Sequence, residues 1–99
     1  MSYASVAKKL VKEKGVEIST MMNSPCLRYK GDFMAMLFEK QDALIIKVSP
    51  KRVDELIASG VGLEFKFTGK KFKEWVLIPS MHNTQYEKYI CEALEYAKN

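Results

Sequence analysis

The stretch LRYKGDFMAMLF, residues 27–38, decides the fold. In its first part Leu27 and Tyr29 alternate with basic residues, which predicts a strand with one buried face. A turn at residues 31–32 follows, and residues 33–38 are all apolar. A strand that is apolar on both faces must be covered on both sides. The sequence therefore predicts a hairpin whose second strand needs cover on each of its faces.

The chain continues from this hairpin into a third strand and a helix. Residues 41–42 favour a turn, and residues 43–48 are rich in the β-branched residues typical of strands. Ser49 and Pro50 form a typical helix start, because Ser can cap a helix and Pro fits its first position. Gly60 marks the end of that helix. We therefore predict an antiparallel meander of three strands, at residues 26–30, 33–39 and 43–48, followed by a helix.

The sequence before and after these strands and this helix also shows regular apolar patterns. Apolar residues recur every three or four positions over residues 2–14, which predicts an amphipathic helix. Residues 63–67 alternate between apolar and polar, and residues 72–78 form a further strand after a turn. A last helix is predicted near Thr84, which with Glu87 matches a capping box. No clear pattern covers the segment between the first helix and the hairpin.

The order of these elements defines a fold class. It reads α-β-β-β-α-β-β-α, with one-sided strands and amphipathic helices. Such elements fit two layers, so we predict an α+β protein with a five-stranded antiparallel sheet and its helices on one face. The length of 99 residues fits a single domain over residues 1–99.

Composition excludes several classes of protein. Charged residues make up 28% of the chain and apolar residues 47%, as in ordinary globular proteins, which argues against a disordered or fibrous chain. No apolar run approaches the roughly 20 residues that span a membrane. The start of the chain shows no signal-peptide pattern, so a cytoplasmic protein with reduced thiols is expected. The net charge of +4 permits an anionic partner without requiring one.

The apolar strand predicts a homodimer. In a regular strand Phe33, Ala35 and Leu37 point to one side, and Met34, Met36 and Phe38 point to the other. Helices on one face of the sheet cover only one of these sets. The other set would be an exposed apolar patch, and symmetric pairing of two copies is the commonest way to bury one. We therefore expect a dimer or partner surface, with this composition: Met34, Met36 and Phe38.

A basic hairpin offers an alternative function. The densest positive run in the chain surrounds the turn between the last two strands, and it consists of Lys66, Lys70, Lys71 and Lys73. These side chains could bind phosphate groups weakly and without sequence preference. The aromatic residues between them are expected to point into the core, whereas nucleic-acid-binding sheets expose aromatic residues to stack on bases. A solvated turn is therefore favoured over a nucleic-acid site.

Cysteine and histidine give little support for an enzyme. Cys26 begins a strand beside basic residues that could lower its thiol pKa, which keeps a thiol-dependent enzyme as an alternative. Cys91 lies beside the apolar stripe of the last helix, and His82, the single histidine, lies in a polar segment. The two cysteines are far apart in the sequence and form no zinc-binding motif. We expect no metal, no cofactor and no enzymatic activity.

The ordered blocks of the sequence resemble a known family. They are LRYKGDFMAML at residues 27–37, ALIIKVSP at 43–50, RVDELIASG at 52–60 and KFKEWVLIP at 71–79. In this order they resemble the N-terminal domain of the TfoX/Sxy family of bacterial competence regulators. The resemblance implies a two-layer fold similar to secretion chaperones, in which dimers are common. It favours a non-enzymatic binding or regulatory domain that acts through protein contacts with an unidentified partner.

Overall fold

The computed structural model describes residues 3–21, 23–67 and 70–99, with side chains left undescribed at residues 66, 67 and 70–72. The three helices are α1 (Tyr3–Leu10), α2 (Pro50–Ala58) and α3 (Tyr86–Lys98). The strands are β1 (Val16–Met21), β2 (Ser24–Tyr29), β3 (Asp32–Phe38), β4 (Ala43–Lys47), β5 (Leu63–Phe67) and β6 (Lys70–Pro79). Two short 3₁₀ helices complete the fold, η1 (Glu39–Gln41) and η2 (Ser80–Gln85).

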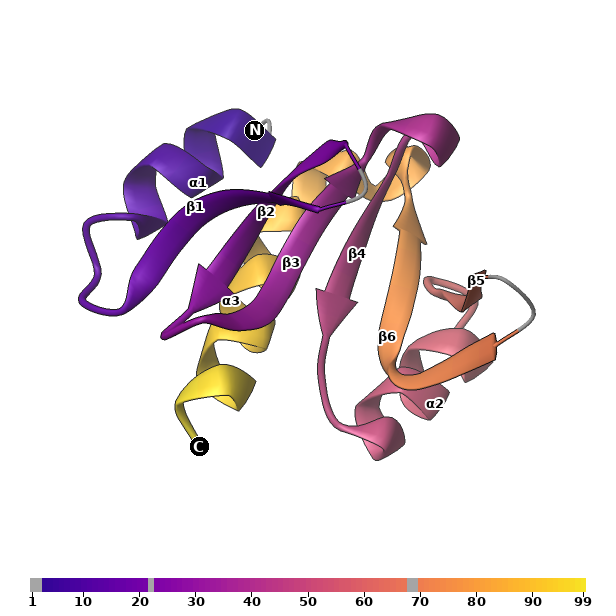
Figure 1. Cartoon of the computed structure of the whole chain (residues 1–99). Helices are drawn as coiled ribbons and strands as arrows, with labels where there is room; N and C mark the ends of the chain where they lie inside the picture. Colours follow the sequence, from indigo (N-terminus) through magenta and orange to yellow (C-terminus); the bar gives the residue numbers. More distant parts are fainter. Residues whose placement is uncertain (1–2, 22, 68–69) are drawn as a thin grey trace.

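The strands form one antiparallel sheet in the order β1-β2-β3-β4-β6-β5 (Figure 1). The α+β class and the antiparallel sheet are confirmed, but the predicted count of five strands is wrong, because the sheet has six. The missing strand is β1, which pairs with β2 from Val16 opposite Tyr29 to Met21 opposite Ser24. In β1 only Val16 is buried, so its sequence lacks the alternation that reveals a half-buried strand.

All three helices pack on one face of the sheet. The core on this face combines residues of every helix with residues of β1, β2, β3, β4 and β6. Ion pairs tie the helices together: Arg52 of α2 makes a two-pronged contact with Glu92 of α3, at 2.8 and 3.1 Å. Lys9 of α1 pairs with Glu87 of α3 at 2.6 Å. The helices therefore form one layer, as predicted.

The opposite face of the sheet has a core of its own without a helix. Its buried residues come from strands alone: Cys26, Phe33, Met36, Phe38, Ala43, Ile45, Phe65 and Leu77. The rings of Phe33 and Trp75 stack with centroids 4.3 Å apart, and Phe38 meets Phe65 edge to face at 5.9 Å. Strand β6 bends sharply, and β5 is turned out of line with the central strands (Figure 1). The bent β5–β6 hairpin thus brings Phe65 and Trp75 over the aromatic side chains of β3.

A β-bulge in β3 changes which side chains face which core. Leu27 lies opposite Ala35 while the next residue, Arg28, lies opposite Phe33, so Met34 has no partner in β2. As a result Met34 and Ala35 both belong to the core on the helix face, and Phe33 belongs to the core on the opposite face. The simple alternation predicted for residues 33–38 is therefore wrong at Phe33 and Met34. A bulge adds one residue to a strand and interrupts its alternation.

The helix ends agree with the sequence in part. The Ser49 hydroxyl accepts a hydrogen bond from the backbone N–H of Arg52 at 3.2 Å, and Pro50 opens α2, as predicted. The capping box at Thr84 is wrong, because Thr84 lies inside η2 and α3 begins at Tyr86. Helix α1 ends at Leu10, earlier than predicted, since the next four residues are exposed and offer no side chain to the core.

Within the described ranges, no helix has the length and apolar character needed to cross a membrane.

Candidate functional site

The three residues predicted to form a partner surface are buried within a single chain. Met34 and Met36 have no exposed surface, and Phe38 is 5% exposed. Met34 packs on the helix face because of the bulge, while Met36 and Phe38 pack under the β5–β6 hairpin. The helix-free face is thus covered by the chain itself, which removes the exposed patch from which the dimer was inferred. The homodimer stays a prediction and needs a different surface.

The basic hairpin is described only in its backbone and at one side chain. Strands β5 and β6 pair with Lys66 opposite Lys71, and Lys73 is exposed further along β6. The side chains of Lys66, Lys70 and Lys71 lie outside the described part of the structure. Weak nucleic-acid binding at this hairpin therefore stays a prediction.

The thiols and the histidine lie in separate places. Cys26 has no exposed surface and packs in the helix-free core. Cys91 is half-buried on α3, where burial and, next, the Glu87 carboxylate raise its thiol pKa. His82 lies half-exposed in η2. Across the described ranges, no three Cys, His, Asp or Glu residues gather in a way that could hold a metal ion.

The outer edge of β1 is the first candidate site. The Gly15 carbonyl accepts a hydrogen bond from Lys30 at 2.8 Å, whereas the N–H of the next residue, Val16, turns away from β2 to Glu13 at 3.2 Å. Because backbone groups of successive residues alternate in direction, those of Ile18 and Thr20 also point away from β2. The Ile18 side chain is 60% exposed. Strand β1, at one edge of the sheet, therefore presents backbone groups without partners in the described part of the chain, beside an exposed apolar side chain.

Side chains of β1 and β2 hold this edge in place. The Glu17 carboxylate accepts a hydrogen bond from the backbone N–H of Gly31 at 2.9 Å. The Arg28 guanidinium donates to the Ser19 hydroxyl at 3.4 Å and to the Gly31 carbonyl at the same distance. These contacts lie on the side of β1 opposite Ile18, so they leave its exposed side chain free.

A pocket beside the end of α3 is the second candidate site. Strand β3 pairs with β4 only as far as Ala35 opposite Ile46, while β4 continues with β6 to Lys47 opposite Trp75. Strands β3 and β4 thus separate at the bulge, and the end of α3 lies next to this gap (Figure 1). The resulting cavity has a volume of about 230 Å³ and is lined by Asp32, Phe33, Lys47, Ala93, Tyr96, Ala97 and Asn99.

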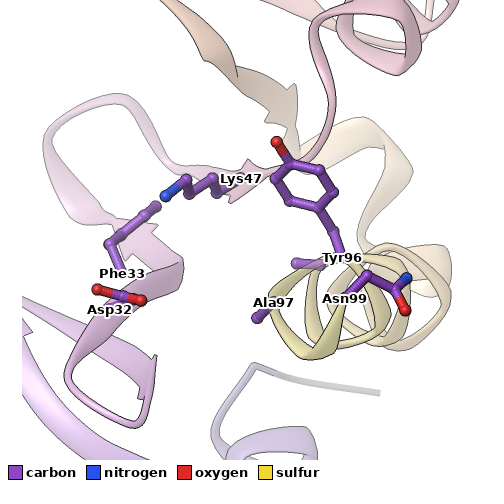
Figure 2. Close-up of a pocket in the computed structure, with 7 residues that line it drawn as sticks. Asp32, Phe33, Lys47, Tyr96, Ala97 and Asn99 are labelled. Atoms are coloured by element: carbon purple, nitrogen blue, oxygen red, sulfur yellow. The ribbon is translucent and has the colours of Figure 1, made fainter.

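The pocket combines opposite charges with an apolar wall. Figure 2 shows the Lys47 ammonium group on the side of Asp32 and Phe33. Asn99 lies on the opposite side, beyond Ala97. Among the residues that the structure describes, neither Lys47 nor Asp32 has an ion-pair partner. The Tyr96 hydroxyl donates a hydrogen bond to Glu74, which raises the tyrosine pKa and occupies that carboxylate. Within the described ranges, Lys47 and Asp32 therefore line the pocket with opposite charges and without ion-pair partners.

A second cavity, of about 200 Å³, lies at the start of α2 and is lined by Pro50, Val53, Asp54 and Lys73. Neither cavity contains a cysteine or a histidine. Sequence reasoning missed both candidate sites. The one available signal at the pocket was Lys47, a lysine directly after the apolar run of β4.

Comparisons with models of protein families, with curated proteins and with solved structures give no match for this chain. The likeness to the TfoX/Sxy family therefore rests on the sequence blocks alone.

Proposed function

We propose that this chain is a non-enzymatic interaction domain that forms a homodimer by pairing the outer edges of β1. The observation that carries the proposal is the position of Ile18, which is 60% exposed on an edge strand whose backbone groups point outward. Edge strands are templates for pairing with another chain, and proteins commonly block them with Lys, Pro or a covering segment. Strand β1, VEISTM, contains neither Lys nor Pro.

An antiparallel pairing centred on Ile18 suits both copies. It places Ile18 opposite Ile18 of the second copy, Val16 opposite Thr20, and Glu17 opposite Ser19. No like charges then face each other, and like charges directly opposite would destabilise the pair. The outward backbone groups of Ile18 lie at the symmetry axis, where each copy can donate one hydrogen bond and accept one. The result is a continuous twelve-stranded sheet, twice the six strands of one copy.

The regulatory part of the proposal comes from the sequence. The resemblance to bacterial competence regulators supports a cytoplasmic binding role through a protein partner. The burial of Cys26 and the raised pKa of Cys91 favour binding over thiol chemistry. A fold of this kind does not by itself specify a function.

Light scattering behind a sizing column tests the dimer. At tens of micromolar we expect a mass of twice the 11.4 kDa chain for the natural protein. Ile18→Lys should give a folded monomer, because it places two like charges at the symmetry axis. The matched control is Leu63→Lys, at a residue that is 54% exposed on the other edge strand, and it should stay dimeric. A natural protein of monomer mass, or a dimer that Ile18→Lys leaves intact, would refute pairing through β1.

A further inference from the structure

We infer that the pocket between β3, β4 and the end of α3 binds a small zwitterion of the amino-acid class. Such a ligand carries a carboxylate, an ammonium group and a short apolar part. The inference does not rest on the homodimer, because the pocket lies beside β3 and β4, whereas the proposed interface is the far edge of β1.

Lys47 supplies the contact for the ligand's carboxylate. Its side chain is half-buried, and its ammonium group lines the cavity without an ion-pair partner in the described ranges. A partly buried cation without a partner has lost some of its hydration, so an incoming carboxylate can form a charge-assisted hydrogen bond with it. Within the described ranges the Glu74 carboxylate forms no ion pair with Lys47, and one of its oxygens accepts a hydrogen bond from the Tyr96 hydroxyl.

Asp32 and the end of α3 favour the ligand's ammonium group. Asp32 contributes a carboxylate that has no ion-pair partner in the described ranges, on the same side as Phe33 (Figure 2). The pocket is also lined by Ala93, Tyr96 and Ala97 from the last two turns of α3. The carboxyl end of a helix bears partial negative charge on its unpaired carbonyl groups and attracts cations. The two charges of a zwitterion thus find opposite partners within one cavity.

The size and the wall of the pocket limit the ligand. A volume of about 230 Å³ corresponds to about seven or eight water molecules, so a ligand with a similar number of non-hydrogen atoms fits. The apolar wall consists of the Phe33 ring, which is stacked on Trp75, and the methyl groups of Ala93 and Ala97. A nucleotide or a sugar chain would extend beyond the cavity. An aliphatic amino acid such as valine matches the size, the charges and the apolar wall.

Titration of the isotope-labelled protein, followed by the amide signals in NMR spectra, tests the inference. The probes are L-valine, isovalerate, which lacks the ammonium group, and isobutylamine, which lacks the carboxylate. We expect L-valine to shift the signals of Ala93 and Ala97, and each half-ligand to bind about tenfold more weakly or worse, because one charge-assisted contact is lost. No shift at these residues with about 20 mM L-valine, or equal binding of the three probes, would overturn the inference.

Variants assign the two charges. Lys47→Met should weaken L-valine about tenfold and leave isobutylamine unchanged, whereas Asp32→Asn should weaken L-valine and leave isovalerate unchanged. The matched control is Lys73→Met, which removes a lysine from the other cavity and should bind L-valine like the natural protein. The same spectra report whether each variant is folded. A folded Lys47→Met that binds L-valine with unchanged affinity, or a loss of binding in Lys73→Met alone, would show that the pocket is not the site.

Discussion

The two faces of the sheet are both closed to water, but by different means. On one face three separate helices supply side chains to a mainly aliphatic core that also includes three buried tyrosines. On the other face the strands close the core themselves, with an aromatic group of Phe33, Phe38, Phe65 and Trp75. The first face needs segments distant in sequence, whereas the second needs one bent hairpin. A strand that is apolar on both faces therefore does not require a second subunit.

The bend of β6 explains why few large residues suffice on the helix-free face. Aromatic side chains bury more area than aliphatic ones and can reach across a concave sheet. Phe65 contacts both Phe38 and Trp75, and Trp75 in turn stacks on Phe33. One hairpin therefore contacts aromatic residues near both ends of β3. The comparison predicts that this smaller core stabilises the protein as strongly, residue for residue, as the core under the helices.

The largest expected effect is the loss of Phe65. Phe65→Ala should lower the free energy of unfolding by about 3–5 kcal/mol, the range for a large aromatic residue in a core, since Phe65 is 2% exposed. Leu44→Ala in the core under the helices should cost about 2–5 kcal/mol. Urea denaturation measures both changes. Met81→Ala, at a residue that is 80% exposed, is the control and should change stability by less than about 0.5 kcal/mol. A cost below about 1 kcal/mol at Phe65 would mean that the helix-free face is not a true core.

A smaller change in the free energy of unfolding, and an increase instead of a decrease, is expected when Tyr3 in the core under the helices is replaced. Its hydroxyl is the one buried side-chain polar atom without a hydrogen-bond partner among the residues described. Tyr3→Phe should therefore raise the free energy of unfolding by about 1 kcal/mol at neutral pH, the lower end of the cost of an unpaired buried group. Tyr89→Phe, which removes the hydrogen bond from the Tyr89 hydroxyl to Gln85, should instead lower stability slightly. A clear loss of stability in Tyr3→Phe would show that this hydroxyl has a partner.

Tyr3→Phe should also change how the free energy of unfolding depends on pH in alkaline solution. Burial, and next the Cys26 thiol, raise the pKa of Tyr3 well above its ordinary value of 10.0. As the pH rises past this ordinary value, the unfolded chain releases the tyrosine proton and the folded chain keeps it. Stability therefore falls above about pH 10, and Tyr3→Phe should flatten that fall. Urea denaturation at neutral and alkaline pH measures the difference between the two slopes.

The smallest expected effect concerns the reactivity of the two thiols, one of which lies on each side of the sheet. Cys26 lies in the helix-free core, while Cys91 packs beside the core under the helices and is half-buried. In the folded protein at neutral pH both thiols should react slowly with a disulfide reagent, and Cys91 should react before Cys26. Single-cysteine variants, Cys26→Ala and Cys91→Ala, separate the two rates.

Glu87→Gln should speed the labelling of Cys91, because the Glu87 carboxylate helps to raise the thiol pKa and also pairs with Lys9. Denaturant should expose both thiols fully. Fast labelling of Cys26 in the folded state at neutral pH would contradict the closed core on the helix-free face.

Much of the fold could be predicted from the sequence, because local chemistry determines its elements. The alternation at Leu27 and Tyr29 and the Ser49 cap of α2 are signals that the structure confirms. Strand β1 could not be found in this way, since Ile18 is exposed and an edge strand buries too little to show a period of two. The bulge at Met34 also left no local signal, because apolar residues surround it on both sides.

The candidate sites were less predictable than the fold. The pocket exists because β3 separates from β4 and α3 lies beside the gap, so it depends on a helix that is distant in sequence from both strands. Nothing about Asp32 alone distinguishes it from an ordinary surface residue, and Lys47 is marked only by its place directly after the apolar run of β4. The burial of Met36 and Phe38 likewise depends on the bend of β6, which no pattern within residues 33–38 reveals.

The bulge divides β3 into two segments in which odd-numbered and even-numbered residues point to opposite faces. Before Met34 an odd-numbered residue, Phe33, faces the helix-free core, and after it the even-numbered residues Met36 and Phe38 do. Deletion of a residue within the regular part of the strand, such as Met36, would exchange the faces of all residues on one side of the gap. Deletion of Met34 or of Ala35, which are adjacent and share the helix face, would instead restore a regular strand in which every remaining side chain keeps its face. Within β3, this adjacent pair marks the place at which the loss of one residue preserves both cores, and the pocket beside α3 opens next to it.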